Sequence, residues 1–197
     1  MNTWSKIRFG DLFFDGTKNG IYKEAEFHGS GTKVVNMGQV FEYLFISNQE
    51  MERYQLTEEE LRKYSLIDGD LVFARRSLVD SGAGKAAIVI GVTEPMVFES
   101  SIIRVRLDPS KCVPLFYLYW LQSFAGRSAI RALVSGTSVK GIKGSDLPNM
   151  LVDYPSIEIQ KVIASLLHQY DEKIKNNELI NANLLQQSKA IFEQLVV

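Results

Sequence analysis

The chain has 197 residues, of which 46% are hydrophobic and 23% are charged. These values are typical of a globular protein and exclude a disordered or collagen-like chain. Basic and acidic residues number 22 and 23, giving a net charge of −1, so the total charge does not indicate a nucleic-acid partner.

Cysteine content and apolar runs indicate the cellular setting. Cys112 is the one cysteine in the sequence, so no intramolecular disulfide can form, and this favours a reducing compartment. Residues 1–10 are polar and lack the apolar run of a signal peptide. The most apolar window, residues 113–121, is too short to cross a bilayer. We therefore expect a cytoplasmic protein with no membrane partner.

Short apolar runs separated by glycine-rich turns occupy residues 1–154 and predict one α+β domain. The expected strands are β-branched or aromatic runs bounded by Gly, Asp, Asn or Pro. They cover residues 33–36, 43–46, 71–74, 86–91 and 101–107. Because strands and helices do not alternate regularly, we do not expect a doubly wound sheet.

Two helices are expected within this domain. Thr57 and the three glutamates after it predict the N-cap and first turn of a helix that runs towards Tyr64. Pro114 is typical of a first helical turn and predicts a second helix. This helix is expected to break near Gly126 and to resume over residues 127–134.

Residues 155–197 predict one long C-terminal helix of the coiled-coil type, because no glycine occurs there and Pro155 stands at its start. Alternating steps of four and three residues define a seam along this helix. The seam consists of Ile163, Leu167, Tyr170, Ile174, Asn177, Asn181, Leu184, Ser188, Ile191 and Leu195. A helix of about 40 residues would extend roughly 60 Å, further than the domain can cover. We expect it to pair with another molecule; a hairpin folded back on the domain is the alternative, but no turn residues support it.

Residues typical of catalytic or metal sites are scarce. His28 and His168 are the only histidines, and no Cys and His residues have the spacing of metal ligands. Residues 81–86 resemble a phosphate-binding loop, but Val79 and Ala86 occupy the positions where that motif requires a glycine and a hydroxyl. We therefore expect no catalytic residue, metal site or cofactor in this chain, and recognition as its function.

One segment of the domain is depleted in acidic residues. No Asp or Glu occurs between Asp108 and Asp146. The basic residues of this interval are Lys111, Arg127, Arg131, Lys140 and Lys143. Such a gap can arise by chance or by burial, or it can mark a contact with a polyanion.

Several stretches in fixed order resemble the specificity subunit of Type I restriction-modification systems. They are an opening strand at residues 4–12, a glycine and strand at 31–37, a Gly-Asp segment at 66–77, a glycine and apolar strand at 84–90, a basic glycine-rich segment at 138–147, Tyr154-Pro155, and a helix start at Gln160, Ile163, Ala164, Leu167, Asp171 and Ile174. The family's Glu-Gln pair is replaced by Ile159-Gln160, with Glu158 one place early, which puts any contact of that glutamate in doubt.

The resemblance implies a non-catalytic chain that reads double-stranded DNA for partner subunits. A methyltransferase subunit would supply S-adenosylmethionine and flip out the target adenine, and a restriction or translocase subunit would use ATP and magnesium. A typical family member has two target recognition domains and two long helices, whereas this chain has one of each. It therefore resembles a half-size subunit that homodimerises through its helix, reads a split palindromic site and docks the methyltransferase, in a bacterial or archaeal cytoplasm.

The residues expected to contact DNA lie in two loops. The first group comprises Arg75, Arg76 and Ser77, with Lys85 nearby, and the second comprises Thr137, Ser138, Lys140 and Lys143. Guanidinium groups bind guanine edges or phosphates, and glycines let backbone amides approach a phosphate closely. The alternatives are a surface pair between one arginine and Asp70 or Asp80, and a solvated turn at residues 135–144. The aromatic residues at 116–120 could stack on bases, but their apolar surroundings favour packing in the core.

Two other functions stay open. The chain could be an inactive fragment or decoy that dimerises and binds a methyltransferase without productive recognition. A stand-alone DNA-modifying enzyme or nuclease is disfavoured, because the sequence lacks the glycine motif for S-adenosylmethionine, the Pro-Pro-aromatic signature and metal-binding carboxylates.

Overall fold

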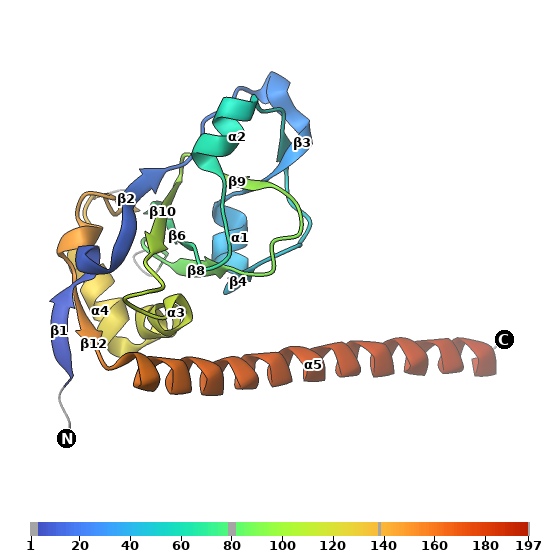
Figure 1. The fold of residues 1–197 in the computed structure, drawn as a ribbon. Coiled ribbons are helices and arrows are strands. Elements are labelled where there is room, and N and C mark those ends of the chain that lie inside the picture. The colour runs from blue at the N-terminus through green and yellow to red at the C-terminus, as the bar shows by residue number, and fades with distance from the viewer. Residues whose placement is uncertain (1–3, 79–81, 138, 197) are drawn as a thin grey trace.

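The computed structural model describes residues 4–78, 82–137 and 139–196 (Figure 1). Its strands are β1 (Ser5–Arg8), β2 (Phe13–Asn19), β3 (His28–Val35), β4 (Phe45–Ile46), β5 (Arg53–Tyr54), β6 (Leu71–Ala74), β7 (Arg76–Ser77), β8 (Ala86–Val89), β9 (Met96–Phe98), β10 (Ile102–Leu107), β11 (Lys140–Gly141) and β12 (Leu151–Tyr154). Its helices are α1 (Met37–Glu42), α2 (Glu58–Tyr64), α3 (Pro114–Gln122), α4 (Phe124–Leu133) and α5 (Ile157–Val196), with 3-10 turns η1 (Phe9–Leu12), η2 (Ala25–Phe27) and η3 (Leu147–Asn149).

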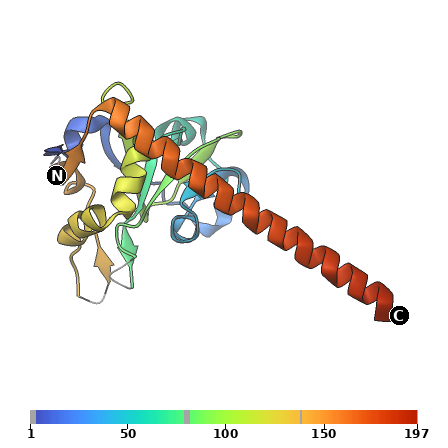
Figure 2. The same cartoon turned by 90° about the horizontal axis from the view of Figure 1, so that it is seen from below.

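A five-stranded mixed sheet in the order β2-β10-β6-β8-β4 forms the centre of the domain. Helix α3 lies between this sheet and α5, with α4 beside it, while α1, α2 and the small sheet β5-β3-β9 lie on the other side (Figures 1 and 2). In β6, Leu71 and Phe73 pack into the core next to α3, whereas Val72 and Ala74 pack into the core next to α1. Because both faces are covered, this strand is apolar throughout rather than alternating.

Capping explains where the short helices begin. Thr57 Oγ1 accepts a hydrogen bond from the Glu60 backbone nitrogen at 3.2 Å, and the Glu60 carboxylate accepts one from the Thr57 nitrogen at 2.9 Å. The predicted cap of α2 is therefore confirmed. Asn36 and Gln39 form the same arrangement at the start of α1, a helix that the sequence reading did not include.

The predicted break between α3 and α4 was wrong in its position. The chain turns at Ser123, whose hydroxyl accepts a hydrogen bond from the Gly126 nitrogen at 3.2 Å and so caps α4. Gly126 lies in the first turn of α4, where an added Cβ would stand 2.1 Å from the carbonyl oxygen of Trp120. The glycine is needed for this close approach and not to interrupt the helix.

The first four turns of α5 pack on the domain. Ala164 is buried, His168 meets the ring of Phe45 edge-on at 5.3 Å, and the Tyr119 hydroxyl donates a hydrogen bond to Asp171. From residue 172 to residue 195 every side chain is exposed, and this part of the helix projects from the domain (Figures 1 and 2). The predicted fold class, an α+β domain followed by a long helix, is confirmed.

One residue of α5 differs from the expected seam. Ile163 is partly buried against the core of its own domain rather than lying on a free face. None of the described helices is long and apolar enough to cross a bilayer.

Candidate nucleic-acid interface

The two segments predicted to contact DNA pair with each other as an antiparallel two-stranded ribbon. In this β7–β11 ribbon, Lys140 lies opposite Ser77 and Gly141 opposite Arg76. The Ile142 nitrogen also donates a hydrogen bond to the Arg75 carbonyl oxygen at 3.0 Å. Figure 2 shows the two strands side by side at the edge of the domain, next to α4. The fold thus joins two basic segments that are far apart in the sequence.

Glycines make the second strand of the ribbon possible. Gly136 has a φ of +105°, and an added Cβ would stand 2.2 Å from the Val139 carbonyl oxygen. Ser135 and Gly141 exchange two backbone hydrogen bonds of 2.9 Å across this turn. An added Cβ on Gly141 would stand 3.0 Å from the Arg75 carbonyl oxygen, a tight contact that a small shift of β7 would have to relieve.

A hollow of about 340 Å³ lies along the β7–β11 ribbon, and we call it the cationic hollow. Its described lining residues are Arg75, Arg76, Ser135, Gly136, Val139, Lys140, Gly141, Ile142 and Lys143. This lining contains four cationic side chains and no carboxylate among the residues that the structure describes. Positive charge, hydroxyl groups and accessible backbone amides are the groups that bind phosphates.

Helix α4 extends the positive surface. An added Cβ on Gly84 would stand 2.4 Å from Ile130 of α4 and 3.5 Å from Ile142, which follows β11, and both isoleucines belong to the same core cluster. Burial lowers the pKa of the Arg127 guanidinium, and the charge of Arg131 lowers it further. Arg127 Nη1 donates a hydrogen bond to the Gly84 carbonyl oxygen at 3.5 Å, which holds this guanidinium against the domain, whereas the Arg131 side chain is exposed.

The acid-free segment of the sequence does not form one surface. The cationic hollow is lined by Lys140 and Lys143. Helix α4, which lies next to the ribbon in Figure 2, carries Arg127 and Arg131. Lys111 lies elsewhere, since its amine is 3.8 Å from the Asp108 carboxylate and donates to the Asp11 carbonyl oxygen at 3.1 Å.

The remaining predicted contact residues have mixed positions. Lys85 donates a hydrogen bond to the Phe41 carbonyl oxygen and is partly buried, so its amine links two parts of the domain. Thr137 is exposed beside the ribbon, and Ser138 lies outside the described residues. The alternative in which Arg75 or Arg76 pairs with Asp70 is wrong, because the Asp70 carboxylate binds Arg106 instead. The other proposed partner, Asp80, also lies outside the described residues.

The aromatic residues of α3 belong to the core, as their apolar surroundings indicated. Phe116, Tyr117 and Trp120 are buried. The Trp120 indole donates to the Asp153 carboxylate at 2.9 Å, and the Tyr117 hydroxyl donates to the Asp153 carbonyl oxygen at 3.1 Å. These residues therefore hold α3 to β12 and are not a stacking platform for bases.

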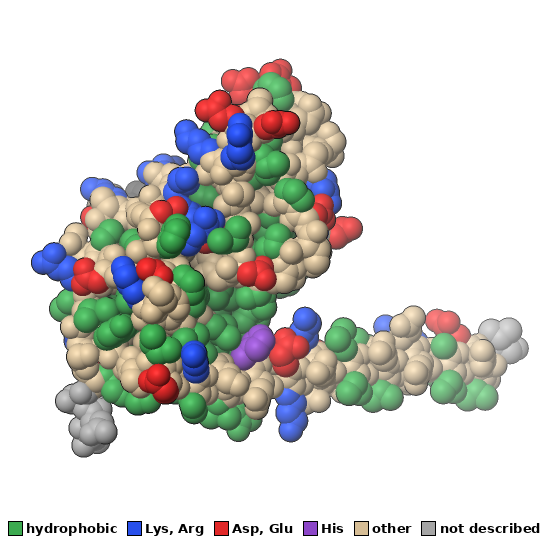
Figure 3. Space-filling model, in the orientation of Figure 1, with side chains coloured by type: hydrophobic (Ala, Val, Ile, Leu, Met, Phe, Trp, Pro, Cys, Tyr) green, Lys and Arg blue, Asp and Glu red, His purple; other side chains and the backbone are tan. Residues whose placement is uncertain are grey.

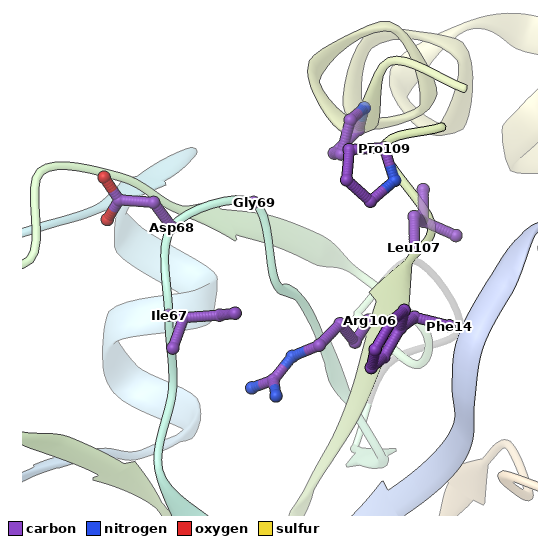
Figure 4. Close-up of a pocket in the computed structure, with 8 residues that line it drawn as sticks. Phe14, Ile67, Asp68, Gly69, Arg106, Leu107 and Pro109 are labelled. Carbon is purple, nitrogen blue, oxygen red and sulfur yellow. The ribbon is translucent and has the colours of Figure 1, made fainter. Parts of the chain in front are cut away.

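A second hollow, which the sequence did not predict, lies at the C-terminal end of β10 (Figure 4). It has a volume of about 250 Å³ and is lined by Phe14, Ile67, Asp68, Gly69, Arg106, Leu107, Pro109 and Pro114. Its lining is mostly apolar, and the guanidinium of Arg106 is already bound by Asp70. Among the described residues, no group of three or more His, Cys, Asp or Glu side chains could hold a metal ion.

The family model for the Type I restriction modification DNA specificity domain matches residues 1–186. The chain belongs to this family. Curated relatives include the EcoKI specificity subunit of Escherichia coli, 25% identical over 195 residues, and the MjaVIII specificity subunit of Methanocaldococcus jannaschii, 26% identical over 176 residues. These matches cover 95% and 87% of this chain, but 41% and 40% of the relatives.

Solved structures share the fold of this specificity domain. The S subunit of M. genitalium superposes with a TM-score of 0.57 and 20% identity, covering 88% of this chain and 40% of that one. The HsdS subunit of Thermoanaerobacter tengcongensis gives 0.60 and 15%, covering 89% and 39%. The resemblance to specificity subunits is confirmed by the family model and the curated relatives, and the solved structures confirm the fold. The chain spans about two fifths of the length of these relatives.

The family motif at the start of α5 has a structural role in this specificity domain. Gln160 is fully buried. Its side-chain oxygen accepts a hydrogen bond from the Val113 nitrogen at 2.9 Å, and its amide donates to the Pro155 carbonyl oxygen at 2.9 Å. Gln160 thus anchors α5 to the start of α3, while Glu158, which stands one place early, is exposed.

Proposed function

We propose that this chain is a non-catalytic specificity subunit that reads double-stranded DNA through residues 1–154 and assembles with its partners through residues 155–197. The observation that carries the proposal is the β7–β11 ribbon, which unites Arg75, Arg76, Lys140 and Lys143 around the cationic hollow. The major groove of B-DNA admits a two-stranded ribbon of this kind. Lysines and arginines neutralise phosphates there, and a few side chains read the base edges.

The projecting part of α5 supports pairing with a second copy. Figure 3 shows hydrophobic side chains along this part of the helix. Ile174, Leu184 and Ile191 are each 56% to 57% exposed, and Leu195 is 80% exposed. Leu167 and Tyr170 continue the same seam towards the domain and are also exposed. Burying this seam against a second helix would remove a large apolar surface from water.

In the proposed dimer the two helices run antiparallel. Two copies would together provide two recognition domains and two long helices, whereas one chain spans about two fifths of each relative. Asn177 and Asn181 lie in the middle of the seam, where buried amides fix the register of a coiled coil. A two-fold symmetric dimer reads a palindromic site, here split by the distance between the domains.

The chemistry would belong to the partners. A methyltransferase subunit docked on the helix pair would supply S-adenosylmethionine and methylate a flipped adenine. Restriction or translocase subunits would use ATP and magnesium. This chain would then bind no cofactor of its own, and the assembled complex would act on the chromosome in the cytoplasm.

Methylation mapping tests the proposal. The chain is expressed with its neighbouring methyltransferase subunit, and N6-methyladenine is mapped across the host DNA. We expect a split palindromic motif that is lost when Arg75 and Arg76 are both replaced by alanine. Arg62→Ala, which removes an exposed charge on α2, is the matched control and should retain the motif. A stable complex that methylates no motif would contradict the proposal and favour the decoy function.

A further inference from the structure

The β7–β11 ribbon carries an apolar tip next to its cations. Leu78 directly follows β7 and is 84% exposed, and Val139 directly precedes β11 and is 49% exposed. Lys140 pairs with Ser77, so Leu78 and Val139 leave the ribbon at the same end, and both side chains line one groove. Two branched apolar side chains therefore stand together at a surface position flanked by Arg76 and Lys140.

These side chains line a groove of about 490 Å³, which we call the apolar groove. Its described lining residues are Met37, Phe41, Arg76, Ser77, Leu78, Ser101 and Val139. Arg76 and Val139 also line the cationic hollow. The two depressions thus adjoin at these two residues, with the cationic lining in one and the mostly apolar lining in the other.

The neighbouring charges identify what would cover the apolar tip. The cationic hollow contains no carboxylate among its described lining residues, so a polyanion is the favoured occupant of the whole surface. A protein partner would fit this surface only if it carried an apolar patch beside a cluster of carboxylates. DNA satisfies both sides, because its backbone is a polyanion and its major groove exposes one apolar group, the C5 methyl of thymine.

We propose that Leu78 and Val139 contact thymine methyl groups in the major groove and are specificity-determining residues. The cations of the ribbon bind phosphates and set its orientation, while the apolar tip distinguishes thymine from the other bases. This inference rests on the proposed DNA-reading function and assigns the base contacts to residues other than the arginines and lysines.

The first experiment determines the motif and then removes only the methyl groups. The full chain, in complex with its methyltransferase subunit, selects from a library of random duplexes, and the selected duplex is remade with deoxyuridine in place of each thymidine in turn. We expect at least one replacement to weaken binding about fourfold, the effect of losing one buried methyl group. Each variant, Leu78→Ser and Val139→Ser, should lose at least one of these preferences, so that its complex binds that thymidine duplex and its deoxyuridine counterpart equally well.

Salt dependence separates this readout from a general loss of binding. Neither variant changes a charge, so both should keep the wild-type dependence of affinity on salt, whereas Arg76→Ala should lower its slope by about one. Both substituted side chains lie at the surface, so the thermal unfolding curves should match the wild-type curve. Ile67→Thr, at an exposed apolar position in the pocket of Figure 4, is the matched control and should keep the preference for thymidine.

The outcomes distinguish the inference from the function on which it rests. If the wild-type complex selects a motif that lacks thymine, binds every deoxyuridine duplex with unchanged affinity, or keeps its preference in both variants, the inference is overturned and the DNA-reading function stands. If the wild-type complex selects no motif at all, both are overturned.

Discussion

The Asp70 carboxylate accepts two hydrogen bonds from the Arg106 guanidinium, from Nε at 2.7 Å and from Nη2 at 2.8 Å. It also accepts one from the Ile67 nitrogen at 2.9 Å, across a turn in which Gly69 has a φ of +92°. Asp70 is fully buried. These bonds tie the start of β6 to β10, and β6 leads directly to Arg75. Gly69 and Asp70 form the Gly-Asp pair, which is the most informative part of the family resemblance within the domain. The pair therefore fixes the strand that leads to the ribbon.

Replacing Asp70 by asparagine should destabilise the domain strongly. The substitution leaves the Arg106 guanidinium without its carboxylate, and removing one partner of a buried ion pair costs about 3 to 5 kcal/mol of unfolding free energy. Urea unfolding followed by circular dichroism measures this loss. Asp11→Asn, at an exposed position, should change the unfolding free energy by less than about 0.5 kcal/mol. Equal stability of the two variants would show that the pair does not hold the fold together.

Salt dependence should separate the cations of the ribbon from Lys85. Arg76→Ala is expected to lower the slope of log affinity against log salt concentration by about one, because one phosphate contact is lost. Fluorescence anisotropy with a duplex of at least 30 base pairs measures the slope.

Lys85→Met provides the contrast to Arg76→Ala. The Lys85 amine donates to the Phe41 carbonyl oxygen, so its loss should lower the unfolding free energy by about 1 kcal/mol and leave the salt slope unchanged. A reduced slope in the Lys85 variant would instead make this amine a phosphate ligand.

Local signals in the sequence predicted those parts of the fold that local interactions determine. The cap at Thr57 and the start of α3 at Pro114 depend on neighbouring residues, and both were predicted correctly. The pairing of β7 with β11 depends on contacts between distant segments that each contribute a strand of two residues. The periodicity of apolar residues carries no information about such pairing. The basic residues of both segments nevertheless predicted that each contacts DNA.

The same limit applies to α5. Its periodic apolar residues predicted the seam, but periodicity alone does not tell which turns face the helix's own domain. Ile163 belongs to the seam by spacing and to the domain core by contact. The buried Gln160 and the hydrogen bond between Tyr119 and Asp171 decide how far the domain covers the helix, and both contacts involve polar groups outside the apolar pattern.

Replacing Leu184 by lysine should abolish the proposed dimer. Leu184 lies on the projecting part of α5 and is 57% exposed, so its substitution cannot disturb the packing of the domain. A charge in the middle of an apolar seam would have to be buried without a partner on dimerisation. Sedimentation equilibrium should show a dimer for the wild-type chain and a monomer of unchanged helix content for the variant.

Asn183→Lys, one residue away but outside the seam, is the control for Leu184→Lys and should remain dimeric. A wild-type chain that stays monomeric at high concentration would argue against the helix pair.

Alkaline pH should destabilise the domain through Cys112. Burial raises the pKa of this thiol to about 12, and the nearby Asp108 carboxylate acts in the same direction. In the unfolded chain the thiol ionises with a pKa of about 8.5. Above that pH the unfolded chain loses a proton that the folded chain keeps, so the unfolding free energy falls as the pH rises.

Comparison with a variant that lacks the thiol isolates this contribution. Between pH 7.5 and 9.5 the wild-type chain should lose about 1.4 kcal/mol more unfolding free energy than Cys112→Ala, because one thiol accounts for the difference and unfolded tyrosines ionise mainly above pH 10. The cavity left by the substitution lowers stability equally at both pH values and so cancels. In the folded wild-type chain the thiol should also resist a disulfide reagent at pH 8 and react once urea unfolds the domain. Parallel pH dependences for the two chains, together with rapid reaction in the folded state, would mean that the thiol is accessible to solvent.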